Sequence, residues 1–314
     1  MIINILLIFI GIVFLVIAFS AAYHSMQLAR EKDSFVPMGE MVEVDHQKMH
    51  VYQEGGGQET LVFMSGNGIS SPIFDFKSLF SLLRDQYKIA VVEKQGYGFS
   101  EITNSPRDIH TIMSQTRKAL ADAGIRAPYI LVPHSASGLE ALYWAHKHPE
   151  EVKAIIGLDI AVPAAYENLK INIPLFHFAS FLAKMGITRW IPNASESSAM
   201  KGGTLTEREK EINRAVFYRR TATKNMLNEV KEIHCNAEKV GNLPTPDVPI
   251  LLFASNGEGT GWDKETWSRT QRDFIQKARQ GRMIELNTPH SVHNIEYHKI
   301  ATETKEFLNH EAAG

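Results

Sequence analysis

Short apolar runs alternate with helix-like stretches along most of the chain. Strand-length apolar runs end in turn residues at "TLVFMSGNG" (60–68), "YKIAVVEKQGYGFS" (87–100) and "PYILV" (128–132). Between them, apolar residues recur at helical spacing, as in Arg107–Ala123. Strands that are apolar throughout and separated by helices are typical of a parallel sheet covered on both faces. The pattern therefore predicts an α/β fold with a mostly parallel central sheet flanked by helices.

The alternation is interrupted in the second half of the chain. From about residue 162 to residue 247 there are helical patterns but no convincing strand, and the alternation resumes at "VPILLFAS" (248–255). An all-helical insertion predicts a cap over the strand ends, where ligands bind in such sheets. The sequence thus predicts five segments: an N-terminal apolar segment (1–22), a linker (23–38), the first part of the core (39–161), the cap (162–247) and the second part of the core (248–314).

The first 22 residues, "MIINILLIFIGIVFLVIAFSAA", contain no charged side chain. About 20 apolar residues are enough to cross a bilayer as a helix. A signal peptide is the alternative, since Ser20–Ala22 are small, but it would usually have a basic start and a shorter apolar core. We therefore expect a single-pass membrane anchor. Arg30 and Lys32 follow the span and favour a cytoplasmic C-terminal domain only weakly, so the side of the membrane stays open.

Composition excludes some functions. The chain is 44% hydrophobic and 22% charged, and its formal net charge is −2. This balance provides no basic surface for nucleic acid, so no nucleic-acid partner is expected. The single cysteine, Cys235, rules out an internal disulfide. The expected partners are the lipid bilayer and a small-molecule substrate.

The stretch "ILVPHSASGLEALYWA" (130–145) places two serines between a predicted strand and a predicted helix. A nucleophilic serine at such a bend needs small residues two positions before and after it, because strand and helix pass close together. Ser135 has Pro133 and Ser137 at these positions, whereas Ser137 would have Leu139 two residues after it. Ser135 is therefore the expected nucleophile and Ser137 the alternative.

From about Met41 to its C-terminus, the sequence resembles the α/β-hydrolase superfamily. The motif "PHSASG" (133–138) is similar to the family's Gly-His-Ser-x-Gly-Gly turn, with proline in place of the first glycine. "MSGNG" (64–68) occupies the place of the turn after the third strand, and "EKQGYGFS" (93–100) looks like the family's Asp-x-x-Gly-x-Gly-x-Ser loop. The predicted hairpin at 41–54 matches the family's opening strands.

The resemblance implies a histidine base in the loop after the last strand. There "LNTPHSVHNIEYH" (286–298) contains three histidines, and the family pattern selects His290, with His293 as the alternative. The spacing of His290 and His293 also occurs in metal sites, but no third ligand is evident. No metal and no cofactor are expected.

The resemblance also implies an acid that orients the histidine. The family's usual ending of the strand "PILLFAS" places this acid at Glu258, and Asp263 and Asp159 are the alternatives. Two backbone N–H groups, of Asn67 and Ala136, match the family's oxyanion hole, which binds the charge that develops on a carbonyl oxygen.

The predicted activity is a serine hydrolase that cleaves a carboxylic ester through an acyl-enzyme. A peptidase or amidase with the same triad, and a non-catalytic binding module of the same fold, are the alternatives. In the predicted cap, Phe176, Phe178, Phe181 and Trp190 are candidates for lining an acyl pocket, but their helical spacing favours core packing.

Overall fold

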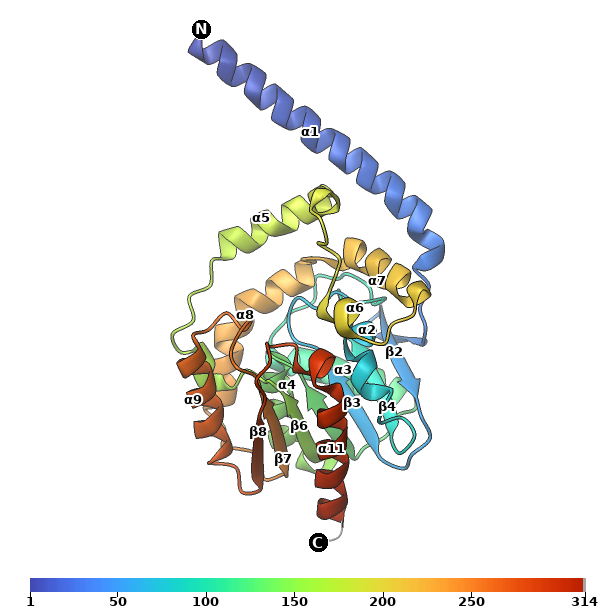
Figure 1. Ribbon diagram of the computed structural model, residues 1–314, viewed down its shortest axis with the longest axis vertical. Coiled ribbons are helices and arrows are strands. Elements are labelled where there is room, and N and C mark those ends of the chain that lie inside the picture. The colour runs from blue at the N-terminus through green and yellow to red at the C-terminus, as the bar shows by residue number, and fades with distance from the viewer. Residues whose placement is uncertain (313–314) are drawn as a thin grey trace.

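The computed structural model describes residues 1–312 and has one eight-stranded sheet at its centre (Figure 1). The strand order is β1-β2-β4-β3-β5-β6-β7-β8. The first two strands pair antiparallel with each other and β2 pairs antiparallel with β4, while the remaining pairs are parallel. The predicted mostly parallel α/β sheet is therefore confirmed. The strands are β1 (Glu40–Val44), β2 (Gln47–Glu54), β3 (Thr60–Met64), β4 (Lys88–Glu93), β5 (Tyr129–Pro133), β6 (Val152–Leu158), β7 (Ile250–Ala254) and β8 (Gly281–Glu285).

The helices flank this sheet and form an insertion between β6 and β7. The α-helices are α1 (Ile2–Arg30), α2 (Pro72–Phe80), α3 (Ile109–Asp122), α4 (Ser137–Lys147), α5 (Ile173–Lys184), α6 (Ser198–Gly202), α7 (Glu207–Arg220), α8 (Lys224–Gly241), α9 (Lys264–Ile275), α10 (Val292–Ile295) and α11 (Tyr297–Ala312). The short 3-10 helices are η1 (Glu31–Ser34), η2 (Pro149–Glu151), η3 (Pro163–Tyr166) and η4 (Ile187–Trp190).

The two faces of the sheet bury separate apolar cores. In β3, Val62 and Met64 belong to the core that also contains side chains of α3, α4 and α9. Leu61 and Phe63, which point to the other face, belong to the core with α2 and α11. Because successive strand residues point to opposite faces, a strand covered on both sides must be apolar at every position. This is why the parallel strands are continuous apolar runs in the sequence.

The antiparallel hairpin is closed by a two-residue turn. Asp45 and His46 both have positive φ, of 52° and 61°. A turn with two left-handed residues matches the twist of the adjoining strands, and aspartate tolerates this conformation better than most residues. The turn sets the register that places Val42 opposite Met49.

The cap helices α5 to α8 lie on one side of the core, and α8 reaches back toward the sheet (Figure 1). Polar side chains fix where these helices begin. Asn172, Thr206 and Thr223 each accept a hydrogen bond from a backbone N–H of the first turn of α5, α7 and α8, respectively. Such caps stabilise a helix by about 1 kcal/mol each.

The N-terminal helix α1 projects away from the core beyond the cap (Figure 1). An 18-residue window of this helix has a mean hydropathy of 3.2, and none of that window is buried inside the protein. Only Ser20 and His24 of α1 are buried. The helix is therefore long and apolar enough to cross a membrane, as a signal sequence would also be.

Candidate active site

The link between β5 and α4 is a tight bend centred on Ser135. Ser135 has a φ of 55°, a left-handed conformation that is rare for residues other than glycine. Small neighbours make room for it, since a Cβ on Gly66 would lie 2.7 Å from the Ser135 Cβ. A Cβ on Gly138 would lie 2.7 Å from Ile160. The strained bend is a feature that proteins keep at functional sites.

Pro133 and Ser137 hold the two ends of the bend. Pro133 ends β5 opposite Met64, and the next amide, of His134, donates to the Met64 carbonyl at 2.9 Å. Although the proline has no N–H to donate, the hydrogen bond from His134 therefore keeps this end of β5 attached to β3. The Ser137 hydroxyl is fully buried, lies 2.6 Å from the same Met64 carbonyl and accepts from the His134 N–H at 2.9 Å. Ser137 is thus occupied inside the turn.

His290 lies in the loop after β8, with its ring between a serine and an aspartate. His290 Nε2 is 2.9 Å from the Ser135 Oγ, and His290 Nδ1 is 2.6 Å from Asp159 Oδ2. The backbone N–H of His290 donates to the Glu258 carbonyl at 2.8 Å. The side chains of Ser135, His290 and Asp159 thus form a continuous hydrogen-bonded chain. In such a chain the imidazole can accept the proton of the hydroxyl through one ring nitrogen while a carboxylate holds the other ring nitrogen.

Asp159 follows β6 directly and is fully buried. Its Oδ1 accepts hydrogen bonds from the Ser255 N–H (2.7 Å), the Trp267 indole N–H (2.9 Å) and the Gln271 amide (3.1 Å). Burial raises the pKa of this carboxyl, but the hydrogen bond and charge of His290 and the hydrogen bonds from Ser255 outweigh burial and hold the pKa below its ordinary value. The carboxylate is therefore ionised at neutral pH.

Two of the three candidate acids lie elsewhere. Glu258, the expected partner of His290, is exposed and contributes its backbone carbonyl, so the expectation of a Glu258 side-chain hydrogen bond is corrected to Asp159. The physical reason is that Glu258 lies in a turn between two glycines with positive φ, which directs its side chain to solvent. Asp263 accepts from the Thr266 N–H at 2.9 Å and caps α9.

Asn67 and Ala136, the two residues expected to provide oxyanion donors, lie on either side of the contact between Gly66 and Ser135 in the two turns that meet there. Gly66, next to Asn67, packs against Ser135, and Ala136 follows it in the chain. Within residues 1–312, neither of their backbone amides donates to a backbone or side-chain hydrogen bond. A small cavity beside them is lined by Asn67, Ala136 and Leu139 and by Glu229, Ile233 and Asn236 of α8. Helix α8 of the cap therefore covers this part of the site.

Sequence reasoning missed a buried cluster of charges that joins α8 to the core. Glu229 of α8 accepts from Arg107 Nε at 3.0 Å and from the Asn67 amide at 3.2 Å, and it also bonds the Tyr97 hydroxyl. Lys94 lies 3.4 Å from Glu229 and 2.6 Å from Glu140. Burial raises the pKa of Glu229, but Lys94 and Arg107 bring it below its ordinary value. The only sequence signal was the scatter of charged residues in otherwise apolar segments.

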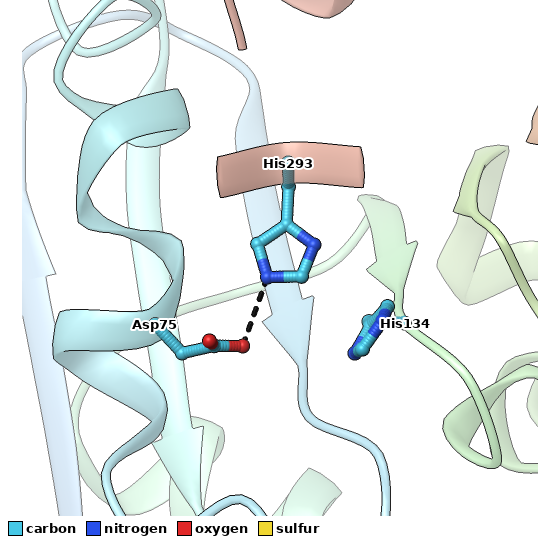
Figure 2. Close-up of side chains that lie close together, drawn as sticks. All are labelled: Asp75, His134 and His293. Carbon is cyan, nitrogen blue, oxygen red and sulfur yellow. Dashed lines mark hydrogen bonds and ion pairs between the residues drawn. The ribbon is translucent and has the colours of Figure 1, made fainter. Parts of the chain in front are cut away.

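A second cluster is formed by Asp75 of α2, His134 directly after β5 and His293 of α10 (Figure 2). His293 Nε2 is 2.9 Å from Asp75 Oδ2, and the ring of His134 packs against His293 with centroids 4.5 Å apart. His134 also lies with its Nε2 3.3 Å from the His290 carbonyl. The sequence named His293 as an alternative base, but its ring bonds Asp75, whereas the ring of His290 bonds Ser135. These residue types bind zinc, and their donor atoms lie within 4.8 Å of one another. Here, however, Asp75 and His293 bond each other directly.

Comparison with known proteins indicates the family. The family model described as alpha/beta hydrolase fold matches residues 59–183. The uncharacterized protein YbdG of Bacillus subtilis is 37% identical over 316 residues, which cover 96% of each chain.

Solved structures with the same fold belong to enzymes that are named for different reactions. An epoxide hydrolase from Vigna radiata superimposes with a TM-score of 0.69 at 16% identity, covering 86% of this chain and 97% of that one. A putative lipase from Acinetobacter baumannii gives a TM-score of 0.66 at 13% identity, covering 92% of this chain and 97% of that one. At such identities the likeness concerns the fold, so the reaction must be argued from the site.

Proposed function

Because the chain belongs to the α/β-hydrolase superfamily, we propose that it is a serine hydrolase that cleaves carboxylic esters through a covalent acyl-enzyme. The observation that carries the proposal is the hydrogen-bonded chain from Ser135 through His290 to Asp159. A serine hydroxyl is a weak nucleophile unless a base accepts its proton, and the base must be held by a third group. In this chain Ser135 is the proposed nucleophile, His290 the base and Asp159 the group that holds the base.

In the proposed acylation step, the Ser135 Oγ attacks the ester carbonyl carbon while His290 Nε2 accepts the hydroxyl proton. The carbonyl π bond opens and its electron pair moves to the oxygen. The N–H groups of Asn67 and Ala136 donate to this oxyanion, and stabilisation of this type is usually the largest contribution to such catalysis. The carbon–oxygen bond to the alcohol then breaks, and His290 returns its proton to the leaving alkoxide. Asp159 stabilises the imidazolium between the two transfers.

In the proposed deacylation step, water takes the place of the alcohol. His290 removes a proton from water as the water oxygen attacks the acyl carbon, and the proton then passes to the Ser135 Oγ as the acid departs. An ester is a more reactive substrate for this mechanism than an amide, because an alkoxide is a better leaving group than an amide anion, which must be protonated before it can leave as an amine. A short p-nitrophenyl ester and the matching p-nitroanilide therefore provide a direct comparison.

The test is fluorophosphonate labelling of the purified protein, with the modified residue mapped by mass spectrometry. We expect Ser135 to be labelled, and Ser135→Ala to lose both labelling and turnover of p-nitrophenyl acetate. Ser137→Ala is the matched control and should keep both, with a lower melting temperature because a buried hydroxyl is removed. Labelling that persists in Ser135→Ala and disappears in Ser137→Ala would refute the assignment. Absence of labelling in the wild type would favour a non-catalytic module.

We further propose that α1 is retained as a membrane anchor. Its Ser20 hydroxyl donates to the Met185 carbonyl of the cap at 2.8 Å and is buried there. Cleavage after Ala22 would remove this contact, which supports an anchor over a signal peptide. The intact mass of the membrane-extracted protein should include residues 1–22. A mass that begins at Tyr23 would instead identify a signal peptide.

A further inference from the structure

Helix α5 turns its large apolar side chains outward. Leu175, Phe178 and Phe181 recur every three residues and so lie along one helix face, where they are 59%, 57% and 45% exposed. The buried residues of α5 are Ser180 and Ala183, on the opposite side. Core packing, which their spacing favoured, is therefore wrong for these aromatic residues. A contiguous exposed apolar surface marks an interaction site.

This surface continues into the part of the cap that holds α1. Trp190, in η4, is 53% exposed and donates its indole N–H to the Ser20 hydroxyl at 3.0 Å. Gly186, between α5 and η4, lies so close to α1 that a Cβ there would be 2.3 Å from the His24 Cβ. The segment from α5 to η4 is thus attached to α1 near Ser20 and His24, and α5 and α1 lie at the same end of the molecule in Figure 1.

Along α1, contacts between aromatic rings are followed by contacts between charged groups, and the change occurs just after Tyr23. The rings of Phe19 and Tyr23 pack against Trp190, with centroids 6.1 and 5.1 Å apart. Between Ile2 and Phe19 the only polar side chain of α1 is that of Asn4, near the start of the helix. After this level the chain is held by ion pairs of Glu31, the first residue of η1, with Arg189 (2.7 Å) and with Arg219 (3.2 Å). Membrane-spanning helices have this order of side chains: an apolar span lies in the hydrocarbon, aromatic residues lie at the interface, and charged groups lie in the water.

From this arrangement we infer that the outward face of α5, extended by Trp190 and Ile191, lies in the interfacial layer of the bilayer that α1 enters. We call this face, formed by Leu175, Phe178, Phe181, Trp190 and Ile191, the cap surface. A helix with an apolar outer face buries that face about 5–10 Å into the boundary between headgroups and acyl chains. The occupant is a lipid surface, because the cap surface is continuous with the exposed apolar span of α1. The inference rests on the proposed anchor but not on the proposed reaction.

The test places an environment-sensitive fluorophore on the cap surface. In a Cys235→Ser background, Phe178→Cys is labelled with nitrobenzoxadiazole and the full chain is reconstituted into phosphatidylcholine vesicles. Arg126→Cys is the matched control, because it is exposed in the loop before β5, at the opposite end of the sheet from the cap. We expect the label at position 178 to show blue-shifted emission and iodide quenching several-fold weaker than at position 126.

The outcomes separate this inference from the anchor and from a protein partner. If the position 126 variant fails to float with vesicles, the anchor is wrong and the cap inference falls with it. If it floats but both labels are equally quenched by iodide, the cap surface is in water and the inference alone is refuted. Shielding of position 178 that depends on protein concentration in detergent would instead indicate a second copy and would also refute it. Circular dichroism that matches the wild type verifies that both variants fold.

Discussion

The carboxylates of Asp159 and Glu258 have opposite environments, although both residues lie in loops near His290. Asp159 is fully buried and bonds His290 and three further donors, of Ser255, Trp267 and Gln271. Hydrogen bonds of this number hold a carboxylate both ionised and in one orientation. Glu258 is exposed, and only its backbone carbonyl meets His290. A side chain that is free to rotate in water does not position an imidazole.

We therefore predict a large loss of activity for one isosteric substitution and almost no change for another. Asp159→Asn should lower kcat for p-nitrophenyl acetate by about 10³–10⁴-fold, because an amide holds the imidazole in the wrong tautomer. Glu258→Gln should leave kcat within about twofold, since surface changes alter free energies by about 0.5 kcal/mol or less. Steady-state kinetics of both variants decide the matter. A larger loss in Glu258→Gln than in Asp159→Asn would return the acid to Glu258.

The sequence indicated Ser135 and His290 more directly than the acid, for a physical reason. Ser135 is marked by the size of its immediate neighbours, and such local packing can be inferred from adjacent positions. The acid depends on which loop ends beside the histidine after folding. Asp159 and Glu258 follow the neighbouring strands β6 and β7, so the direction of each turn decides between them. Asp159 itself has a φ of 47°, which the sequence pattern does not reveal.

At the scale of elements, helix α8 is linked to the turn that carries one of the proposed oxyanion donors. The Asn67 side chain donates to the Met226 carbonyl at 3.1 Å and to Glu229 at 3.2 Å, and both acceptors belong to α8. Glu229 is in turn held by Arg107 and Lys94. Because buried charges are costly unless paired, this cluster strongly favours one position of α8 over the core. The cap thereby fixes the position of the Asn67 turn.

Removal of the Glu229 charge should disturb this link. We predict that Glu229→Gln lowers the free energy of unfolding by about 3–5 kcal/mol, since it leaves Arg107 and Lys94 with fewer counter-charges in a buried site. Glu238→Gln, at an exposed position of the same helix, is the control and should change it by less than about 0.5 kcal/mol. Urea unfolding in detergent measures both. Equal stability of the two variants would show that the charge cluster does not hold the cap.

The strands and helices of the core could be predicted because each of their hydrophobic patterns fits only one kind of secondary structure. A strand such as β3, buried on both faces, must be apolar throughout, and the helices that cover it must repeat every three to four residues. The cap differs, because an apolar helix face packs equally well against a protein core or a lipid surface. The spacing of Phe178 and Phe181 in α5 could not distinguish these environments. The exposure of these two side chains in the folded cap, and the burial of Ser180 and Ala183, show which side of α5 faces outward.

At the scale of the whole molecule, the buried ring of His134 packs between the rings of His290 and His293, with centroids 4.7 and 4.5 Å apart. His134 is buried, and its pKa lies well below its ordinary value because of burial first and then the charges of His293 and His290, with Asp75 and Asp159 opposing them. The folded chain therefore binds fewer protons at this site than the unfolded chain below about pH 6.5. The stability of the folded state must fall as the pH decreases through that value.

The carboxylates behave differently, so the two effects separate on the pH scale. Asp159 and Asp75 have lowered pKa values, and the stability that they contribute is complete above their unfolded pKa of about 3.9 and is lost only at lower pH. Between pH 7.5 and pH 5.5, any loss of stability therefore comes mainly from histidines. This interval separates the contribution of the histidines, His134 among them, from that of the carboxylates, and the His134 variant then identifies its share.

We predict that the free energy of unfolding of the full chain in detergent decreases between pH 7.5 and pH 5.5, and that His134→Asn reduces this decrease. One proton per molecule gives a slope of up to about 1.4 kcal/mol per pH unit below pH 6.5, which urea unfolding at several pH values resolves. His46→Asn is the matched control, because its side chain is 97% exposed and lies in the hairpin turn far from the site. It should retain the wild-type slope. An unchanged slope in His134→Asn would show that His134 is not the buried neutral histidine that makes the folded state sensitive to mild acid.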